Sequence, residues 1–338
     1  MMRRVLVSLL VLVGLGIIAA YEILWAPNTF EGDRFIIVSR GESFRQALDS
    51  LDHAGISRNR LLLDLAGRML GVTEQVQVGK YRFKSGMSNK EILEDLRFGK
   101  TIEAITTTVI EGLRATRLAK LLLRTIGIDS SRFISILSDS SFVCNLGVDG
   151  RTLEGYLMPA TYRFYWQQDE KEIIMELVKE FWKIFDDSLR ARAGQLGLTI
   201  SEVLSLASII EQETAIDSER ALIAGVYYNR LKRGMRLQAD PTIQFLLDDG
   251  PRRLVYSDLF RESEYNTYRH EGLPPGPINS PGRASIVAAL YPAQHKYMYF
   301  VANGMGGHKF NKTFVQHGRA VKQLRKFREE QEARKEAG

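Results

Sequence analysis

The sequence contains a single cysteine, Cys144, among its 338 residues. One cysteine cannot close an intramolecular disulfide or supply a CxxC pair, so structural zinc bound through cysteines is excluded. The motifs GxxxxGK(S/T), HExxH and GxSxG are absent as well, which removes the usual signatures of a phosphate loop, a zinc peptidase and a serine hydrolase. We therefore expect neither a metal ion nor another cofactor.

Glycine and proline are not enriched enough to mark an unusual class of protein. The chain has 28 glycines and 9 prolines, too few for a collagen-like or low-complexity protein. Its 45% of hydrophobic residues is enough to build a large core. The sequence is therefore that of a globular protein, long enough for two domains.

The charge is positive but spread along the chain. Lys and Arg number 46 against 40 Asp and Glu, which gives a formal net charge of +6. Because these basic residues do not gather into one stripe, we expect no nucleic-acid partner. A lipid headgroup layer or an anionic wall polymer fits the same charge equally well.

The N-terminus carries one long apolar run. Two arginines are followed by apolar or small residues from 5 to 20, and further apolar residues extend the segment to Trp25. About 20 such residues are what an α-helix needs to cross a bilayer. We expect a transmembrane anchor at residues 5–25, with residues 1–4 in the cytoplasm, because arginines favour that side.

This anchor would make the chain a single-pass protein of the cytoplasmic (inner) membrane, with its bulk on the periplasmic side. A cleaved signal peptide has a similar charged start and apolar middle, but Tyr21 and Glu22 lead into more apolar residues rather than into a polar mature N-terminus. A buried helix of a soluble protein would need apolar contacts on all sides. The uncleaved anchor is the interpretation that fits best.

Beyond the anchor, residues 35–99 are expected to form one small α+β unit. The pattern predicts a strand at 35–38, a helix starting at Ser43, a second helix at 61–70, a strand at 77–83, and a helix that Ser88 and Glu91 open as a capping box. A new strand is predicted at 101–110, which we take as the entry to a larger mixed α+β domain. The fold class predicted for the chain is therefore α+β.

Residues 198–214 form the most informative predicted helix. Thr199 and Glu202 make a capping box, and a helical wheel places Glu211 on the apolar side and Glu213 beside Glu202. A carboxyl group on an apolar face loses hydration, which raises its pKa toward the range useful for protonating a leaving group. Glu211 is therefore the candidate catalytic residue.

The alternative is that Glu211 lies at the helix edge and pairs with an arginine such as Arg220 or Arg230. The helix by itself leaves the two interpretations equally open. Two histidines farther along, His308 and His317, match no zinc spacing and are interpreted as hydrogen-bonded structural residues.

Three loops follow that are dense in amide, hydroxyl and aromatic groups, at residues 234–242, 265–268 and 272–282. Aromatic platforms interleaved with amides and carboxylates suit the ring faces and hydroxyls of a sugar chain. The same Pro- and Gly-containing loops can also be rigid turns without a binding role. At the C-terminus, residues 319–338 are expected to be helical and to end in a solvated charge run.

Several of these motifs resemble the YceG-like endolytic murein transglycosylases, also called the MltG family. The resemblance rests on the N-terminal anchor together with LEGYLMP (153–159), TY (161–162), LASIIEQET (206–214), YNRL (228–231), LQADPT (237–242), YNTY (265–268), GLPPG (272–276) and YFVA (299–302). It covers nearly the whole chain. The sequence departs from the family pattern at Met158 and Ala160, where Phe and Asp would be expected.

The resemblance implies a domain plan and a site. Residues 35–99 would be a LysM-like unit, and residues 100–330 the catalytic domain. Glu211, which closes the run ASIIE, would be the catalytic residue. Candidate substrate-binding residues in the loops are Gln238, Asp240, Asn266, Tyr268 and Asn279.

The implied reaction is cleavage of the β-1,4 bond between N-acetylmuramic acid and N-acetylglucosamine without water, leaving a 1,6-anhydro end. One carboxyl suffices, because the C6 hydroxyl of the substrate is the attacking group, whereas ordinary glycosidases need two carboxylates. The implied partners are peptidoglycan glycan strands, the membrane and wall synthases, beside which the protein would end the growth of nascent strands. Two alternatives stay open: a non-catalytic peptidoglycan-binding scaffold for synthases, and a hydrolase that uses Asp240 as a second carboxylate.

Overall fold

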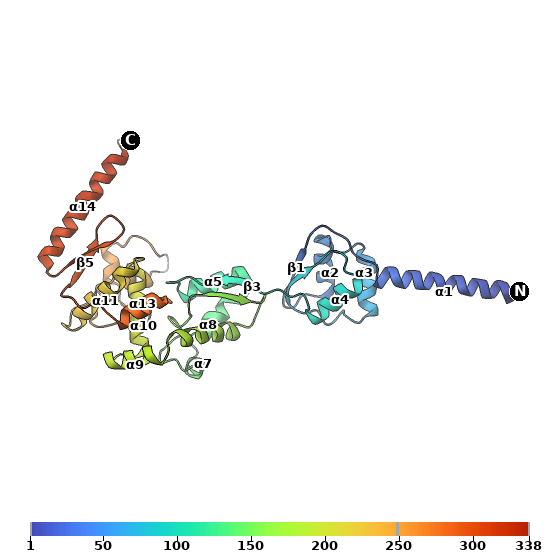
Figure 1. The fold of residues 1–338 in the computed structure, drawn as a ribbon, viewed down its shortest axis with the longest axis horizontal. Helices are drawn as coiled ribbons and strands as arrows, with labels where there is room; N and C mark the ends of the chain where they lie inside the picture. Colours follow the sequence, from blue (N-terminus) through green and yellow to red (C-terminus); the bar gives the residue numbers. More distant parts are fainter. Residues whose placement is uncertain (1, 248–249, 337–338) are drawn as a thin grey trace. The chain divides into compact units, whose positions relative to one another are not determined.

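The computed structural model describes residues 2–247 and 250–336, and the chain divides into two compact units. The first consists mainly of residues 1–107, and the second mainly of residues 108–121, 129–161 and 170–338. Figure 1 shows the order of the elements along the chain. Both units mix helices with short strands, which confirms the α+β class.

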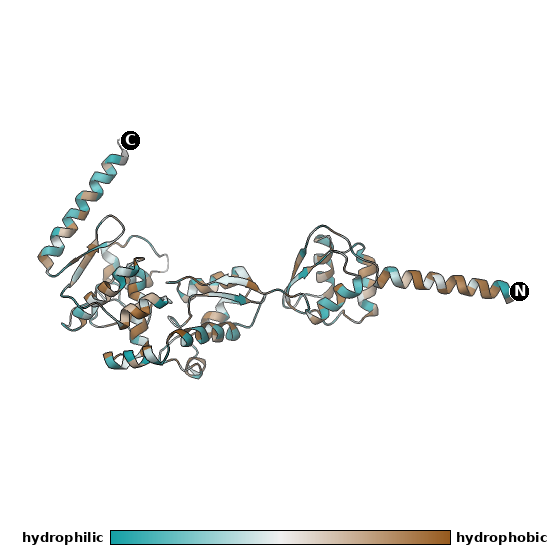
Figure 2. Cartoon of the chain, in the orientation of Figure 1, coloured by the Kyte–Doolittle hydropathy of each residue, from teal (hydrophilic) through white to brown (hydrophobic). Residues whose placement is uncertain are grey.

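The N-terminal run is a continuous helix, α1 (Met2–Leu24), and none of its residues is buried. Within the part of the chain that the structure describes, α1 is long and apolar enough to cross a membrane. The hydrophobic colour predominates along α1 in Figure 2, apart from the hydrophilic N-terminal end. The helix begins three residues before the predicted span, since Met2 and the two arginines join its first turn.

The rest of the first unit is a strand–helix–helix–strand–helix arrangement. Its elements are β1 (Arg34–Val38), α2 (Phe44–His53), α3 (Arg60–Met69), β2 (Gly79–Phe83) and α4 (Asn89–Phe98). β1 and β2 are antiparallel, with Ile36 opposite Tyr81. The side chains that point inward from this sheet and from the helices form one apolar core. The likeness of this unit to LysM stays a prediction.

Local capping explains where the helices of this unit begin. Ser43 caps α2, with Gln46 completing the box, and Ser88 caps α4 together with Glu91 as predicted. In both, the hydroxyl accepts a backbone N–H that the helix leaves unpaired. These starts are therefore set by neighbouring residues rather than by the tertiary fold.

The strand predicted at 101–110 is shorter in the structure. β3 (Ile105–Thr108) forms a two-stranded sheet with β4 (Thr161–Phe164). Before β3, Ile102 forms only an isolated antiparallel bridge with Tyr81 of β2, and the backbone N–H of Thr101 donates to the Asp95 carboxylate at 2.7 Å. The predicted strand therefore loses its first four residues and its last two.

Helices dominate the second unit. They are α5 (Ala115–Ile126), α6 (Ser130–Ile136), α7 (Ser140–Asn145), α8 (Glu170–Ile184), α9 (Asp187–Leu196), α10 (Ile200–Glu213), α11 (Asp217–Leu231), α12 (Asp240–Phe245), the 3-10 helix η1 (Tyr256–Phe260), α13 (Arg283–Leu290) and α14 (Phe314–Glu336). β5 (Tyr299–Ala302) and β6 (His308–Asn311) form an antiparallel pair. α14 begins five residues before the predicted start.

α10 is the central helix of the second unit. Thr199 and Glu202 form the predicted capping box at its start, and all its residues from Val203 to Ile210 are buried. It packs against α9, α11, α12 and α13. A helix that is covered on nearly every side holds its C-terminal residues in fixed positions, and the candidate site lies at that end.

Candidate active site

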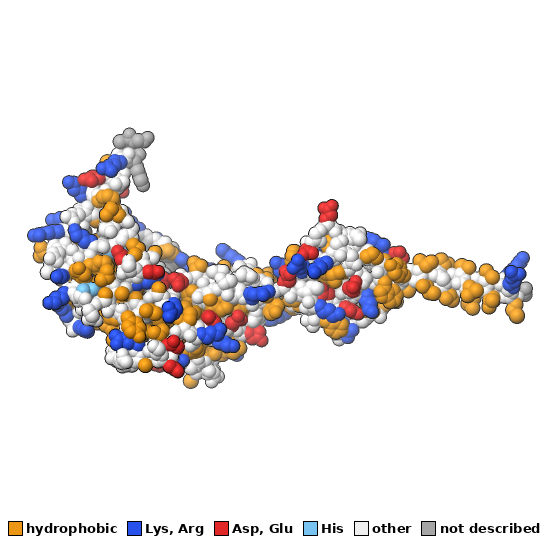
Figure 3. Space-filling view, in the orientation of Figure 1, with side chains coloured by type: hydrophobic (Ala, Val, Ile, Leu, Met, Phe, Trp, Pro, Cys, Tyr) orange, Lys and Arg blue, Asp and Glu red, His pale blue; other side chains and the backbone are white. Residues whose placement is uncertain are grey.

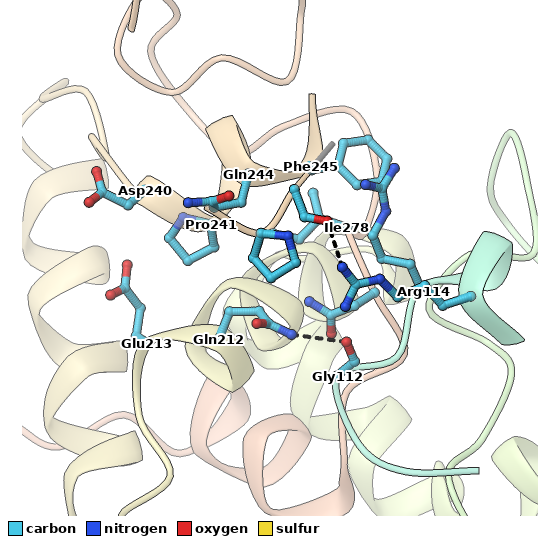
Figure 4. A pocket seen from close by; sticks show the side chains of 13 residues that line it. Gly112, Arg114, Gln212, Glu213, Asp240, Pro241, Gln244, Phe245 and Ile278 are labelled. Atoms are coloured by element: carbon cyan, nitrogen blue, oxygen red, sulfur yellow. Dashed lines mark hydrogen bonds between the residues drawn. The ribbon is translucent and has the colours of Figure 1, made fainter. Parts of the chain in front are cut away.

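A pocket of about 340 Å³ lies at the C-terminal end of α10. Its walls come from that helix end, from the segment preceding α5, from α12 and from the loops at 250–251 and 278–279. Figure 4 shows Glu213 and Asp240 together at one end of the pocket, and Arg114 with Phe245 at the other. Segments that are distant in the sequence therefore line one pocket, and the carboxyl groups of Glu213 and Asp240 lie at one end of it.

A second hollow of about 290 Å³ begins at the same two carboxyls. It shares Glu213 and Asp240 with the first pocket and is otherwise lined largely by aromatic side chains, including Tyr268, Tyr299 and Phe300. The two acidic residues thus stand where the hollows meet. An extended ligand that fills both hollows would pass directly over them.

Glu213 is the last residue of α10, and its environment favours proton exchange near neutral pH. The hydroxyl of Tyr227 on α11 donates to its Oε1 at 2.6 Å. Burial raises the pKa of Glu213 to about 7, and the charge of Asp240 adds to the rise, whereas Tyr227 and Arg230 act against it. A carboxyl with this pKa can both give and accept a proton at neutral pH, as a general acid or base must.

The sequence did not predict that another helix covers Glu213. The helical wheel places it beside Glu202 on the polar side of α10. In the structure α11 packs against α10, so the side that looks solvent-facing on an isolated wheel is covered at this end. The raised pKa of Glu213 is therefore a product of tertiary packing.

Glu211 lies outside the linings of both hollows. Its side chain is 7% exposed, and its Oε1 is 3.2 Å from the Arg220 guanidinium, which is equally buried. Its Oε2 accepts the backbone N–H of Gly282 at 2.9 Å. The ion pair with Arg220 is one of the two pairings that the sequence left open. Together with the bond from Gly282, it leaves both carboxylate oxygens of Glu211 engaged.

Glu111 lies at the exposed edge of the cluster that Glu211 and Arg220 form. Partial burial raises the pKa of Glu111, and the neighbouring charge of Glu211 adds to the rise. A Cβ on Gly282 would stand 1.9 Å from a Glu111 oxygen, so a larger residue at 282 would displace the Glu111 carboxyl. Arg220 also hydrogen-bonds Asp217 and Ser285, and the cluster therefore links α10, α11 and α13.

Three of the predicted substrate-binding residues border the second hollow: Gln238, Asp240 and Tyr268. The Tyr268 hydroxyl donates to Oδ1 of Asp240 at 2.5 Å, and burial raises the pKa of Tyr268 above its usual value. Gln238 has a φ of 49°, in the left-handed region, while its N–H donates to the Thr267 carbonyl at 3.0 Å. The structure thus brings these three loop residues together.

Asn266 is positioned differently from the prediction, because it is fully buried. Its Nδ2 donates to the carbonyls of Leu259 at 3.0 Å and Arg261 at 2.7 Å, and its Oδ1 accepts the N–H of Tyr268 at 2.9 Å. An amide with these three backbone partners shapes the loop. The substrate-binding role of Asn266 stays a prediction.

Asn279 is almost fully buried but lines the first pocket. Its Nδ2 donates to the Ser208 carbonyl at 2.8 Å, whereas its Oδ1 has no hydrogen-bond partner among the described residues. A buried acceptor without a donor is costly unless a ligand or water supplies one. Asn279 therefore keeps a free acceptor at the pocket.

The segment before α5 supplies site residues that the sequence did not indicate. The guanidinium of Arg114 lies 4.5 Å from the centre of the Phe245 ring, and Arg117 in the first turn of α5 donates to the Gly250 carbonyl at 2.7 Å. Gln212 Nε2 donates to the Gly112 carbonyl at 2.9 Å and ties this segment to α10 (Figure 4). Gly112 and Gln212 lie a hundred positions apart, so no local sequence pattern could predict this bond.

The profile of the YceG-like family matches residues 36–323 of the sequence. This chain belongs to the YceG-like family. A Bacillus subtilis (strain 168) protein named endolytic murein transglycosylase is 33% identical over 258 residues, which is 72% of this chain and 72% of that protein. A protein of the same name from Streptococcus pneumoniae (strain D39) is 27% identical over 299 residues, 79% of this chain and 53% of that protein.

The similarity to the YceG-like family extends to solved structures. The crystal structure of a yceG-like protein from Listeria monocytogenes matches this chain with a TM-score of 0.62 and 28% sequence identity. The match covers 86% of this chain and 99% of that one. The fold is therefore shared over most of the chain.

The two histidines nearest the C-terminus of this YceG-like chain have different surroundings. His308 pairs through Nδ1 with Glu219 at 2.7 Å, which confirms the hydrogen-bonded structural role. His317 stacks on Tyr299 with ring centres 5.3 Å apart and lines the second hollow, and its Nδ1 has no partner among the described residues. Burial, with Arg230 nearby, lowers the pKa of His317, so its ring is neutral at pH 7.

Proposed function

We propose that this protein is a membrane-anchored endolytic peptidoglycan transglycosylase. It cleaves the β-1,4 bond between N-acetylmuramic acid and N-acetylglucosamine and leaves a 1,6-anhydro end. The family and the names of two relatives support the general activity. The observation that carries the site is the Glu213 carboxyl, whose pKa is raised to about 7 where the two hollows meet.

In the proposed mechanism the protonated Glu213 donates its proton to the glycosidic oxygen, and the bond from that oxygen to C1 of the muramic acid breaks. The C6 hydroxyl of the same sugar attacks C1 and closes the 1,6-anhydro ring. Its proton passes to the Glu213 carboxylate, which restores the starting state. No water is consumed, so one carboxyl performs both proton transfers.

Glu213, rather than the Glu211 predicted from the sequence, is our candidate for this role. Glu213 lines both hollows, whereas Glu211 lines neither and its two oxygens are engaged by Arg220 and Gly282. A general acid must lie within hydrogen-bond reach of the atom that it protonates. The geometry therefore favours Glu213 over Glu211 as the general acid.

The two hollows support cleavage inside a strand rather than at its end. Sugar units on both sides of the broken bond need room, and a hollow extends to either side of Glu213 and Asp240. Aromatic side chains such as Tyr299 and Phe300 offer faces for sugar rings on one side. Arg114 and Asn279 offer polar groups on the other. Asp240 and Tyr268 are proposed to orient the sugar nearest Glu213.

The test compares Glu213→Gln with Glu211→Gln in the full-length protein in detergent. Each variant is incubated with purified peptidoglycan, and released fragments are analysed by mass spectrometry. Glu213→Gln should lower the formation of 1,6-anhydro product about 100- to 10,000-fold, the usual contribution of a general acid. Glu211→Gln should keep its turnover per folded molecule, and loss of product only in Glu211→Gln would restore the assignment made from the sequence.

The same products separate the alternatives. A hydrolase would release reducing ends, which are one water heavier than anhydro ends. A scaffold would bind peptidoglycan and release nothing from either wild type or variant. The further proposal that the protein ends the growth of nascent strands beside wall synthases predicts shorter glycan strands when the wild type is overproduced, and unchanged lengths with Glu213→Gln.

We also propose that α1 anchors the protein, with its N-terminus in the cytoplasm and both units outside. The exposed Cys144 serves as a reporter, since it is the single thiol of the chain. A membrane-impermeant maleimide should label it in intact spheroplasts, and Cys144→Ser should abolish the signal. Labelling only after lysis would reverse the orientation, and a mature mass lacking residues 1–25 would identify a signal peptide instead.

A further inference from the structure

The first unit joins α1 directly, without a flexible linker. Ile23 and Leu24, at the end of α1, pack against the apolar core of the unit. The carbonyl of Ile23 accepts a hydrogen bond of 2.8 Å from the Asn89 side chain, and Glu22 forms an ion pair with Arg58. α1 also packs against α3 and α4. The unit therefore begins within one helical turn of the apolar segment.

α3 carries an apolar stripe on the outside of this junction. Leu63, Ala66 and Gly67 face the core, whereas Leu61, Leu65 and Met69 are 75%, 44% and 58% exposed. Residues four apart lie on one face of a helix, so these three side chains form a continuous row. We call this row the α3 stripe. Figure 3 shows hydrophobic side chains gathered on the unit where α1 leaves it.

Two aromatic side chains lie at the same level, one in the last turn of α1 and one directly after it. Tyr21 and Trp25 are 53% and 50% exposed. Such amphipathic rings favour the boundary between acyl chains and headgroups. Because α3 packs against α1 and Arg58, just before α3, pairs with Glu22, the beginning of α3 lies at this boundary when α1 spans a bilayer.

We propose that the α3 stripe inserts into the outer leaflet of the bilayer that α1 spans, so that the first unit lies on the membrane rather than standing away from it. The occupant of this face is the acyl-chain and glycerol region of the lipid. An apolar row next to a membrane span is buried by lipid without any further partner, whereas in water it would stay exposed. This inference rests on the proposed anchor and adds a second contact to it.

The charges around the stripe indicate which lipids matter. Arg60 pairs with Asp49, and Arg68 pairs with Asp64 at 2.8 Å. Because these arginines are already matched by carboxylates, as Arg58 is by Glu22, the surface carries little net charge of its own. Insertion is therefore apolar in origin and should be equally deep in zwitterionic and anionic bilayers.

The test uses the full chain with Cys144→Ser in lipid nanodiscs, and with one nitroxide-labelled cysteine at a time. Leu65→Cys probes the stripe, and Leu12→Cys probes the middle of α1. Ile37→Cys is the matched control, because Ile37 is 39% exposed on β1 of the same unit, on the side away from α1 (Figure 1). Collision rates with oxygen, which enriches in lipid, and with a water-soluble nickel chelate are measured at each position.

The ratio of oxygen to nickel collisions at position 65 should exceed that at position 37 several-fold, with the same ratio in phosphatidylcholine and phosphatidylglycerol nanodiscs. Equal ratios at positions 65 and 37, with a lipid-like ratio at position 12, would contradict insertion of the α3 stripe and would leave the proposed anchor intact. A water-like value at 12 would overturn both. Dipolar broadening between labels at 65 would show a second copy covering the stripe, which also overturns the proposal.

Discussion

The hydroxyl of Tyr227 and the carboxyl of Glu213 are joined by a hydrogen bond of 2.6 Å, between the body of α11 and the last residue of α10. The bond fixes the direction of the carboxyl. It also stabilises the ionised form, so it holds the pKa of Glu213 below the value that burial alone would give. Position and acidity of the proposed catalytic group thus depend on one phenol.

Tyr227→Phe should therefore raise the pKa of Glu213 further above about 7. The alkaline limb of the profile of kcat/KM against pH should move to higher pH, because the carboxyl stays protonated longer. We expect kcat to fall by about tenfold through loss of positioning, a loss of about 1.4 kcal/mol in the transition state. An unchanged pH profile would mean that the phenol has no influence on the ionising group.

Asp240→Asn removes the negative charge that raises the pKa of Glu213. The alkaline limb should move to lower pH, opposite to the effect of Tyr227→Phe, while the product keeps its 1,6-anhydro end. Rates at pH 5, where Glu213 is protonated in both proteins, isolate any loss of sugar binding. Complete loss of product, together with reducing ends from the wild type, would instead identify Asp240 as a second catalytic carboxylate.

Glu211→Gln should reduce stability rather than chemistry. Breaking a buried pair leaves the Arg220 guanidinium without its buried partner, which typically costs about 3 kcal/mol. Urea unfolding of the full chain in detergent measures the change, and Glu176→Gln on the exposed face of α8 is the control, expected to stay within about 0.5 kcal/mol of wild type. A double variant with Arg220→Met should cost less than the sum of the two single changes.

The difference in stability between Glu213→Gln and the wild type should depend on pH. The pKa of Glu213 is about 7 in the folded protein, against a reference value of 4.5. The folded state therefore binds the proton more tightly, and the wild type loses stability as the pH rises from the reference value to about 7. Glutamine does not ionise. The difference between the melting temperature of the variant and that of the wild type should therefore increase, in favour of the variant, from pH 5 to pH 8. Glu154, whose pKa burial also raises to about 7, is the same in both proteins.

The features that sequence predicts well here are local ones. The capping boxes at Ser88 and Thr199 each involve a residue three positions away, and both are present as expected. The apolar face of α10 follows from its period alone. Helix starts and buried faces need only neighbouring residues, so a single sequence specifies them.

The site depends on contacts that no local pattern contains. Glu213 receives its hydrogen bond from Tyr227, fourteen positions later, and Gln212 binds the Gly112 carbonyl, a hundred positions earlier. A helical wheel treats α10 as an isolated helix with one solvent-exposed side, and it therefore favoured Glu211. Our proposal of Glu213 rests instead on the neighbouring helix α11, whose Tyr227 hydrogen-bonds that carboxyl.

Asn266 illustrates a second limit of the sequence. An asparagine in a loop suits a sugar hydroxyl and a backbone carbonyl equally well, because one amide donates in both cases. In the structure the amide donates to the carbonyls of Leu259 and Arg261, and such bonds are a property of the tertiary structure. Gln238 and Tyr268, from the same loops, do reach a hollow.

Gln238 has one further consequence. A left-handed φ of 49° costs a residue with a side chain about 1 kcal/mol that glycine would avoid. Gln238→Gly should therefore raise the melting temperature, but it would also remove an amide from the rim of the second hollow. At position 238, thermal stability favours glycine, whereas the rim of the hollow needs glutamine. Directed evolution for thermal stability alone would therefore select a substitution that removes this amide.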